Sequence, residues 1–115
     1  MEKAESIAAL AALAQETRMD IFRLLVASGA EGKPAGQIGK QLGLPSATLS
    51  FHLNQLRRVG LVTARRRSRS IIYSADYRTM DALMSFLSSA CFPGQPAPWE
   101  DPSVSVHGDT WRVRP

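Results

Sequence analysis

Residues 35–60 read AGQIGKQLGLPSATLSFHLNQLRRVG, and this stretch decides the fold. It divides into two short helical patterns at Gly43-Leu44-Pro45, because glycine commonly ends a helix and proline cannot continue one. The apolar positions of each pattern share one helical face: Ala35, Ile38 and Leu42 in the first, then Leu49, Leu53 and Leu56 in the second. Two short amphipathic helices joined by a tight turn predict a helix-turn-helix.

Two β-prone runs follow the second helix at residues 61–65 and 70–74. They are joined by residues 66–69, which read RRSR, so the pattern predicts a β-hairpin with a basic tip. A hairpin in this position is expected to act as a wing beside the helix-turn-helix. The connection has Ser68 and no glycine, which leaves the conformation of the turn open.

The positive charge of the chain is concentrated in the same region. Residues 46–78 contain seven arginines and one acidic residue, Asp76, while residues 1–45 are neutral and residues 79–115 are net acidic. Arginine presents a rigid fork of donors that suits phosphates and guanine edges. A solvated basic face is the alternative, but the charge coincides with a helix-turn-helix and a wing. The combination predicts binding to double-stranded DNA.

The second helix, expected from Ala47 to Val59 with Ser46 as its N-cap and Gly60 after its end, is the predicted recognition helix. Its small, polar N-terminal half suits close entry into a major groove. We expect the following residues to face base edges: Ala47, Thr48, Ser50, Phe51 and Asn54. Phosphate contacts are expected from Arg57 and Arg58 late in this helix, and from the wing residues Arg66, Arg67 and Arg69.

Two aromatic side chains of this helix have alternative roles. Phe51 is expected to pack against a thymine methyl group, or else to be a partly buried ring that packs on the neighbouring helix. His52 lies at the edge of the buried stripe, so a structural or DNA-backbone role is favoured over base reading.

Three more helices complete a mostly α fold with a small β-hairpin. The patterns predict helices over residues 5–15, from Thr17 as N-cap to Ser28, and from about Asp76 to Cys91. In the first of these, Ile7, Leu10, Ala11 and Ala14 share a face. Together with the helix-turn-helix, this makes a winged helix-turn-helix domain of five helices plus the wing.

The last helix carries an apolar stripe with no later helix to cover it: Met80, Leu83, Met84, Leu87, Ala90 and Cys91. An exposed stripe of this size favours a partner, and we expect it to form a homodimer interface. A tail folded back on the stripe is the alternative. A two-fold dimer would place two recognition helices about 34 Å apart, matching an inverted-repeat operator.

The chain is expected to divide into the winged domain at residues 1–92 and a Pro-rich tail at 93–115, with a possible small hairpin at 104–113. The longest apolar run is too short to span a membrane, and no signal peptide is recognisable, so a cytoplasmic protein is expected. No nucleophile–base arrangement or phosphate loop is present, which argues against an enzyme.

Four segments resemble the ArsR family of winged-helix repressors: LAQETRMDIFRLL at 13–25, SATLSFHL at 46–53, LRRVGLV at 56–62 and IIYS at 71–74. The resemblance covers about residues 5–92. It implies a homodimer joined through its first and last core helices, which adds Ile7 and Leu10 to the expected interface. It also implies a pseudo-palindromic operator and repression relieved by an effector.

Two metal sites that occur in the family are absent from this sequence. The third helix has no Cys-x-Cys pair, and no histidine follows Asp76 and Asp81 on the last helix. The segment FLSSACFPG at 86–94 resembles arsenite-responsive members that end this helix with adjacent cysteines, but Phe92 replaces the second one. Three readings of Cys91 stay open: a small apolar interface residue, a redox-active thiol, or a ligand for arsenite or another thiophilic species.

The alternative function is a DNA-binding repressor without metal sensing, whose tail, with Trp99 and Trp111, binds a small molecule or a protein partner.

Overall fold

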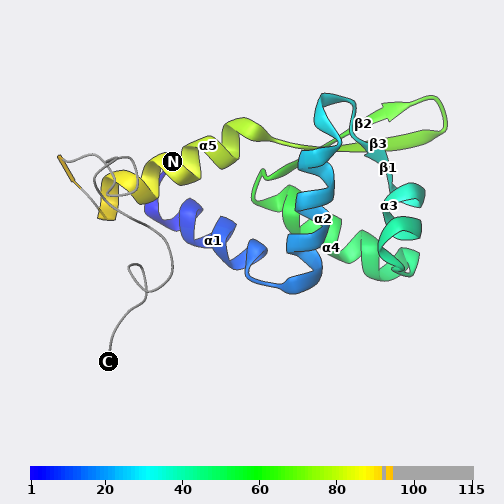
Figure 1. The fold of residues 1–115 in the computed structure, drawn as a ribbon, viewed down its shortest axis with the longest axis horizontal. Helices are drawn as coiled ribbons and strands as arrows, with labels where there is room; N and C mark the ends of the chain where they lie inside the picture. The colour runs from blue at the N-terminus through cyan, green and yellow to red at the C-terminus, as the bar shows by residue number, and fades with distance from the viewer. Residues whose placement is uncertain (92, 95–115) are drawn as a thin grey trace, which may run out of the picture.

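A computed structural model describes residues 1–91 and 93–94 (Figure 1). The elements in chain order are α1 (Lys3–Leu13), α2 (Glu16–Ala27), η1 (Gly29–Glu31), β1 (Lys33–Pro34), α3 (Ala35–Leu42), α4 (Ser46–Arg58), β2 (Val62–Arg67), β3 (Ser70–Ala75) and α5 (Tyr77–Cys91). The predicted class, mostly α with a wing, is confirmed. The predicted hairpin at 104–113 and nearly all of the tail lie outside the described residues.

The helix-turn-helix is built by α3 and α4, as predicted, with one correction at the start of α4. Gly43 ends α3 in the left-handed region at φ 65°, and the Leu44 N–H donates to the Gly39 carbonyl at 2.9 Å. The predicted N-cap, Ser46, is instead the first helical residue. Pro45 takes the cap position in extended conformation, and its carbonyl accepts the Leu49 N–H at 2.9 Å. The ring restricts φ of Pro45 and lets the helix begin at the next residue.

The wing strands are longer than their sequence predicts. β2 and β3 pair antiparallel from Val62↔Ala75 to Arg67↔Ser70, so Arg66 and Arg67 lie in a strand and the turn contains Ser68 and Arg69 alone. Cross-strand pairing extends the ladder through arginines that have little β preference of their own. Ser68 takes a positive φ of 57°, the region where a glycine is favoured.

A third strand, β1, was not predicted. It pairs antiparallel with β3 through Lys33↔Tyr73 and Pro34↔Ile72, which gives the sheet order β1-β3-β2. Two residues are too few to show an alternating pattern, so the sequence carries no signal for this strand.

The core lies where α2, α3 and α4 meet the base of the sheet. Its fully buried large side chains come from four helices and the connection between α4 and β2: Ile21, Leu25, Ile38, Leu53, Leu56, Leu61 and Leu83. Each such side chain contributes roughly 1.5–3 kcal/mol by leaving water. This packing holds α4 against the domain by the stripe that its sequence predicts.

Two boundaries near the N-terminus differ from the predictions. α1 covers Lys3–Leu13 rather than residues 5–15, and Thr17 lies inside α2 instead of capping it. Gln15 is the N-cap, since its side-chain oxygen accepts the Arg18 N–H at 2.8 Å. Glutamine is an uncommon cap, which explains why threonine was the stronger signal.

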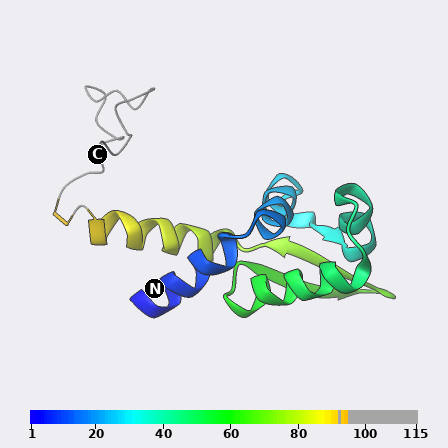
Figure 2. The same cartoon turned by 90° about the horizontal axis from the view of Figure 1, so that it is seen from below.

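The orientation of α1 is set by its small residues. The side that contacts the domain consists of Ser6, Ala9, Ala12 and Leu13, while the more apolar face with Ile7 and Leu10 is exposed. Ser6 can be buried because its hydroxyl donates to the Glu2 carbonyl at 3.0 Å. α1 and α5 lie side by side at the end of the molecule opposite the wing tip (Figures 1 and 2).

Gly32 connects η1 to β1 at a position where no side chain fits. Its φ is +70°, and a Cβ there would collide with the Tyr73 carbonyl and the Ser74 hydroxyl of β3. We expect Gly32→Ala to destabilise the domain by about 2–4 kcal/mol, measured by urea unfolding. The control is Gly36→Ala, because a Cβ at Gly36 meets nothing within 4 Å inside α3. That variant should gain about 0.5–1 kcal/mol, and equal effects at the two glycines would contradict the assigned close approach.

Candidate nucleic-acid interface

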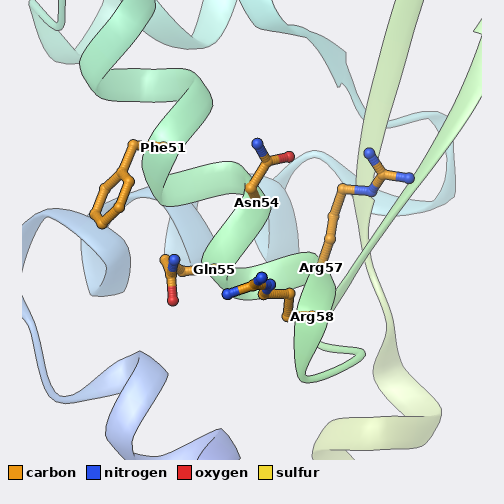
Figure 3. Close-up of a pocket in the computed structure, with 5 residues that line it drawn as sticks. All are labelled: Phe51, Asn54, Gln55, Arg57 and Arg58. Carbon is orange, nitrogen blue, oxygen red and sulfur yellow. The ribbon is translucent and has the colours of Figure 1, made fainter.

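One side of α4 is fully open to solvent. Every residue that was predicted to face DNA from this helix is exposed: Ser46, Ala47, Thr48, Ser50, Phe51, Asn54, Arg57 and Arg58. Toward its C-terminal half this side forms an open hollow of about 540 Å³, lined by Phe51, Asn54, Gln55, Arg57 and Arg58 (Figure 3). Gln55 was not predicted, although it follows Phe51 by one helical turn.

Phe51 is a large apolar side chain exposed on this surface. Its side chain is 57% exposed, so the alternative of a ring packed on a neighbouring helix does not describe the single chain. The ring makes one aromatic contact, edge to face with His52 of the same helix, at 5.4 Å between centroids and 68° between planes. This contact restricts the ring without covering it.

His52 is held inside the domain by Arg18, a residue that the sequence analysis did not single out. The Arg18 Nε donates to the Ala12 carbonyl of α1 at 2.6 Å, and its Nη1 lies 3.3 Å from His52 Nδ1. Arginine has no acceptor, so Nδ1 must accept and the neutral ring carries its proton on Nε2. Arg18 thus connects α1 and α2 to α4, and the contacts of His52 are intramolecular, as the structural interpretation expects.

The pKa of His52 is lowered from its ordinary value of 6.5, first because burial desolvates the ring and second because the Arg18 charge repels the protonated form. The folded state therefore binds fewer protons than the unfolded state as the pH falls below 6.5 toward the lowered pKa. We expect the contribution of neutral His52 to the free energy of unfolding to be present above pH 6.5 and to decrease as the pH falls below it. His52→Gln should flatten this decrease in urea unfolding between pH 7.5 and 5.5. A decrease that persists unchanged in His52→Gln would assign the effect to other groups.

The wing contains two kinds of arginine. Arg66, Arg67 and Arg69 are exposed near the tip, and no hydrogen bond to another described residue holds their guanidinium groups. Arg65 is different, because its Nη2 donates to the Glu31 carbonyl at 2.7 Å and its Nη1 to the Ala30 carbonyl and Ser74 Oγ at 3.3 Å each. Arg65 therefore fixes the wing to the η1 segment, and the three tip arginines stay available to a ligand.

The wing lies next to α4, and both elements carry exposed arginines. β2 contacts α4, and the wing tip extends past the helix-turn-helix, away from α1 and α5 (Figures 1 and 2). An exposed helix with a polar N-terminal half beside a basic hairpin has the dimensions and charge to follow a DNA groove and its flanking phosphates.

A second exposed surface is apolar and lies at the opposite end. On α1, Ile7 is 56% exposed and Leu10 is 39% exposed, and on α5 Met84 is 61% exposed. Of the predicted stripe on α5, Leu83 is buried, Met80 and Leu87 pack partly on the core, and Met84, Ala90 and Cys91 are exposed. We call Ile7, Leu10, Met84 and Cys91 the α1/α5 face.

Comparisons with known proteins agree with this geometry. A family model described as a helix-turn-helix domain matches residues 13–65. The transcriptional activator HlyU of Vibrio cholerae is 32% identical over 89 residues, which cover 76% of this chain and 80% of HlyU. The chain belongs to the ArsR/HlyU family of winged helix-turn-helix transcriptional regulators.

Solved structures place the ArsR/HlyU chain in the same fold. An ArsR-like transcriptional regulator from Rhodococcus sp. RHA1 is 28% identical with a TM-score of 0.69, over 76% of this chain and 80% of that one. The homodimeric winged helix-turn-helix DNA-binding domain Mb0332 from Mycobacterium bovis, a possible ArsR-family regulator, is 26% identical with a TM-score of 0.62, over the same shares.

The family assignment makes this chain a transcriptional regulator with a DNA-binding helix-turn-helix, and not an enzyme. Across residues 1–91 and 93–94, no three or more His, Cys, Asp and Glu side chains gather in a way that could hold a metal ion. None of the helices described there combines the length and hydrophobicity of a membrane span.

Proposed function

We propose that this ArsR/HlyU chain is a homodimeric, sequence-specific repressor that binds an inverted-repeat operator. The observation that carries the proposal is the pairing of two surfaces at opposite ends: the basic α4 and wing surface, and the exposed α1/α5 face. A two-fold axis through the second surface would repeat the first one, which is the geometry that an inverted repeat requires.

Dimerisation is supported by the cost of leaving the α1/α5 face in water. Ile7 and Met84 are each more than half exposed, although burying either side chain is worth roughly 1.5–3 kcal/mol. The related Mb0332 domain is described as homodimeric. We infer that a second copy of this chain covers the face, with Met80, Leu83 and Leu87 supporting it from below.

The DNA contacts divide by chemistry. Ala47, Thr48, Ser50, Phe51 and Asn54 are proposed to face base edges, since they occupy the exposed N-terminal and central part of α4. Phosphate contacts are proposed for Arg57, Arg58 and the three tip arginines of the wing. Ser46, now the first helical residue, can offer its backbone N–H and hydroxyl to a phosphate at the helix N-terminus.

Repression by occupation of the operator is the simplest regulatory output of these two surfaces. HlyU is described as an activator, so the direction of regulation needs its own measurement with a reporter gene downstream of the operator. Release by thiol chemistry is supported only by the exposure of Cys91 at the end of α5, and one thiolate per chain does not complete a site for arsenite. The alternative, a tail that binds a small molecule or a protein, falls on residues outside those described.

Salt-dependent binding to duplex DNA tests the proposal. Fluorescence anisotropy should show affinity for a selected operator falling by roughly 10³-fold or more between 50 and 200 mM salt, as six or more phosphate contacts require. Inserting five base pairs between the half-sites should abolish specific binding, because it turns the two half-sites to opposite sides of the duplex. Affinity that is indifferent to salt would contradict DNA binding, and tolerance of the insertion would contradict the rigid dimer.

A further inference from the structure

We infer that each operator half-site contains adjacent A·T pairs, of which Phe51 reads a thymine methyl group and Asn54 an adenine. The inference rests on the proposed operator binding and names the base chemistry that α4 selects. It starts from the presence of one exposed aromatic ring among polar and charged side chains on α4. Phe51 is an aromatic ring, 57% exposed, and its companions around the hollow are Asn54, Gln55, Arg57 and Arg58 (Figure 3).

The first step is the chemistry of the major groove. The base edges present hydrogen-bond donors and acceptors throughout, and the 5-methyl group of thymine is the one apolar feature among them. A phenyl ring entering the groove therefore gains by covering a methyl group and loses by covering a donor or acceptor. Phe51 is thus complementary to thymine, and a half-site with G·C in its place leaves polar edges against the ring.

The second step is the orientation of the ring. Its edge-to-face contact with His52, at 5.4 Å between centroids, holds it before DNA arrives. Arg18 holds His52 in turn through Nδ1 at 3.3 Å. A restricted side chain loses little conformational entropy on binding. The free energy gained from the methyl contact is therefore little reduced by the cost of ordering the ring.

The third step is the position of Asn54. It follows Phe51 by three residues on the same exposed side of α4, about 4.5 Å along the helix axis, which is between one and two base-pair steps of about 3.4 Å. A side-chain amide matches the N6 donor and N7 acceptor of adenine, and no other base edge offers that pair. With Phe51 on a thymine, Asn54 lies over a neighbouring pair, so the two residues specify consecutive A·T pairs.

The experiment changes single chemical groups on the bases of the operator. Operators are first selected from random duplexes with the full chain, and each thymine of the half-site is then replaced with uracil, which removes the methyl group alone. At one thymine per half-site we expect the affinity to fall roughly 10-fold, because the dimer loses two methyl contacts. In Phe51→Ala, which is weaker at the start, the same replacement should change the affinity less than 2-fold.

The matched control is Gln55→Ala, from the same helical side, which should keep the full uracil effect. Replacing the neighbouring adenine with 7-deazaadenine should weaken operator binding by the unmodified chain. The same replacement should leave operator binding by Asn54→Ala unchanged. Because Phe51 and Asn54 are exposed, both variants should unfold at the urea concentration of the unmodified chain.

The outcomes separate this inference from the proposed function. An enriched operator that tolerates uracil at every thymine, or that responds equally in Phe51→Ala, overturns the methyl contact and leaves operator binding intact. A selection without any enriched sequence overturns both.

Discussion

Replacing Arg66, Arg67 and Arg69 together with alanine should weaken operator binding at least 100-fold and flatten its salt dependence. The three guanidinium groups are exposed at the wing tip, and a dimer presents six of them. If each neutralises one phosphate, the slope of log affinity against log salt becomes less steep by about 5. Fluorescence anisotropy at several salt concentrations measures both quantities with one labelled duplex.

Two variants make this result specific to the wing. Arg23→Ala removes an exposed arginine of α2, outside the wing and α4, and should leave the slope unchanged. Lysine at all three wing positions retains the charge and should restore most of the slope, while the loss of the arginine fork keeps the affinity below that of the unmodified chain. If the triple alanine variant binds as tightly as the unmodified chain, the wing does not contact DNA.

Ile7→Glu combined with Met84→Glu should convert the dimer into a folded monomer. Both side chains are more than half exposed in the single chain, so the charges do not disturb its core. In a two-fold interface each substitution occurs twice, and the lost apolar burial with two added charges per subunit should raise the dimer dissociation constant more than 100-fold. Sedimentation equilibrium measures the mass, and operator affinity should fall to that of one half-site.

Met19→Glu is the matched control, since Met19 is a 39% exposed methionine on α2, a helix outside the proposed interface. It should remain dimeric and bind the operator normally. A double variant that stays dimeric would place the interface elsewhere, whereas one that unfolds would show that the exposed face stabilises the single chain. Circular dichroism distinguishes the second outcome.

Much of the exposed surface of α4 could be predicted because its determinants are local. The period of Leu49, Leu53 and Leu56 orients α4, and this orientation turns Asn54 and Arg58 away from the core. Helix ends at Gly43 and Pro45 follow likewise from backbone chemistry that one residue carries.

Other features depend on contacts between distant residues. Arg65 belongs by sequence to the basic block, yet its guanidinium binds carbonyls 34 and 35 residues away. Arg18 shows no signal at all, because its importance comes from the carbonyl of Ala12 and the ring of His52 meeting around it. β1 exists only because β3 lies beside it.

The sequence by itself determined the order of the five α-helices and the two wing strands, and the helix-turn-helix at residues 35–60. Only the tertiary structure decided which arginines are free, which side of α1 packs inward, and how far the wing strands extend. The physical reason is the range of the interactions. Helical period and caps act within a few residues, whereas the packing of α1, the Arg65 contacts and the sheet register are set by groups that meet only when the chain has folded.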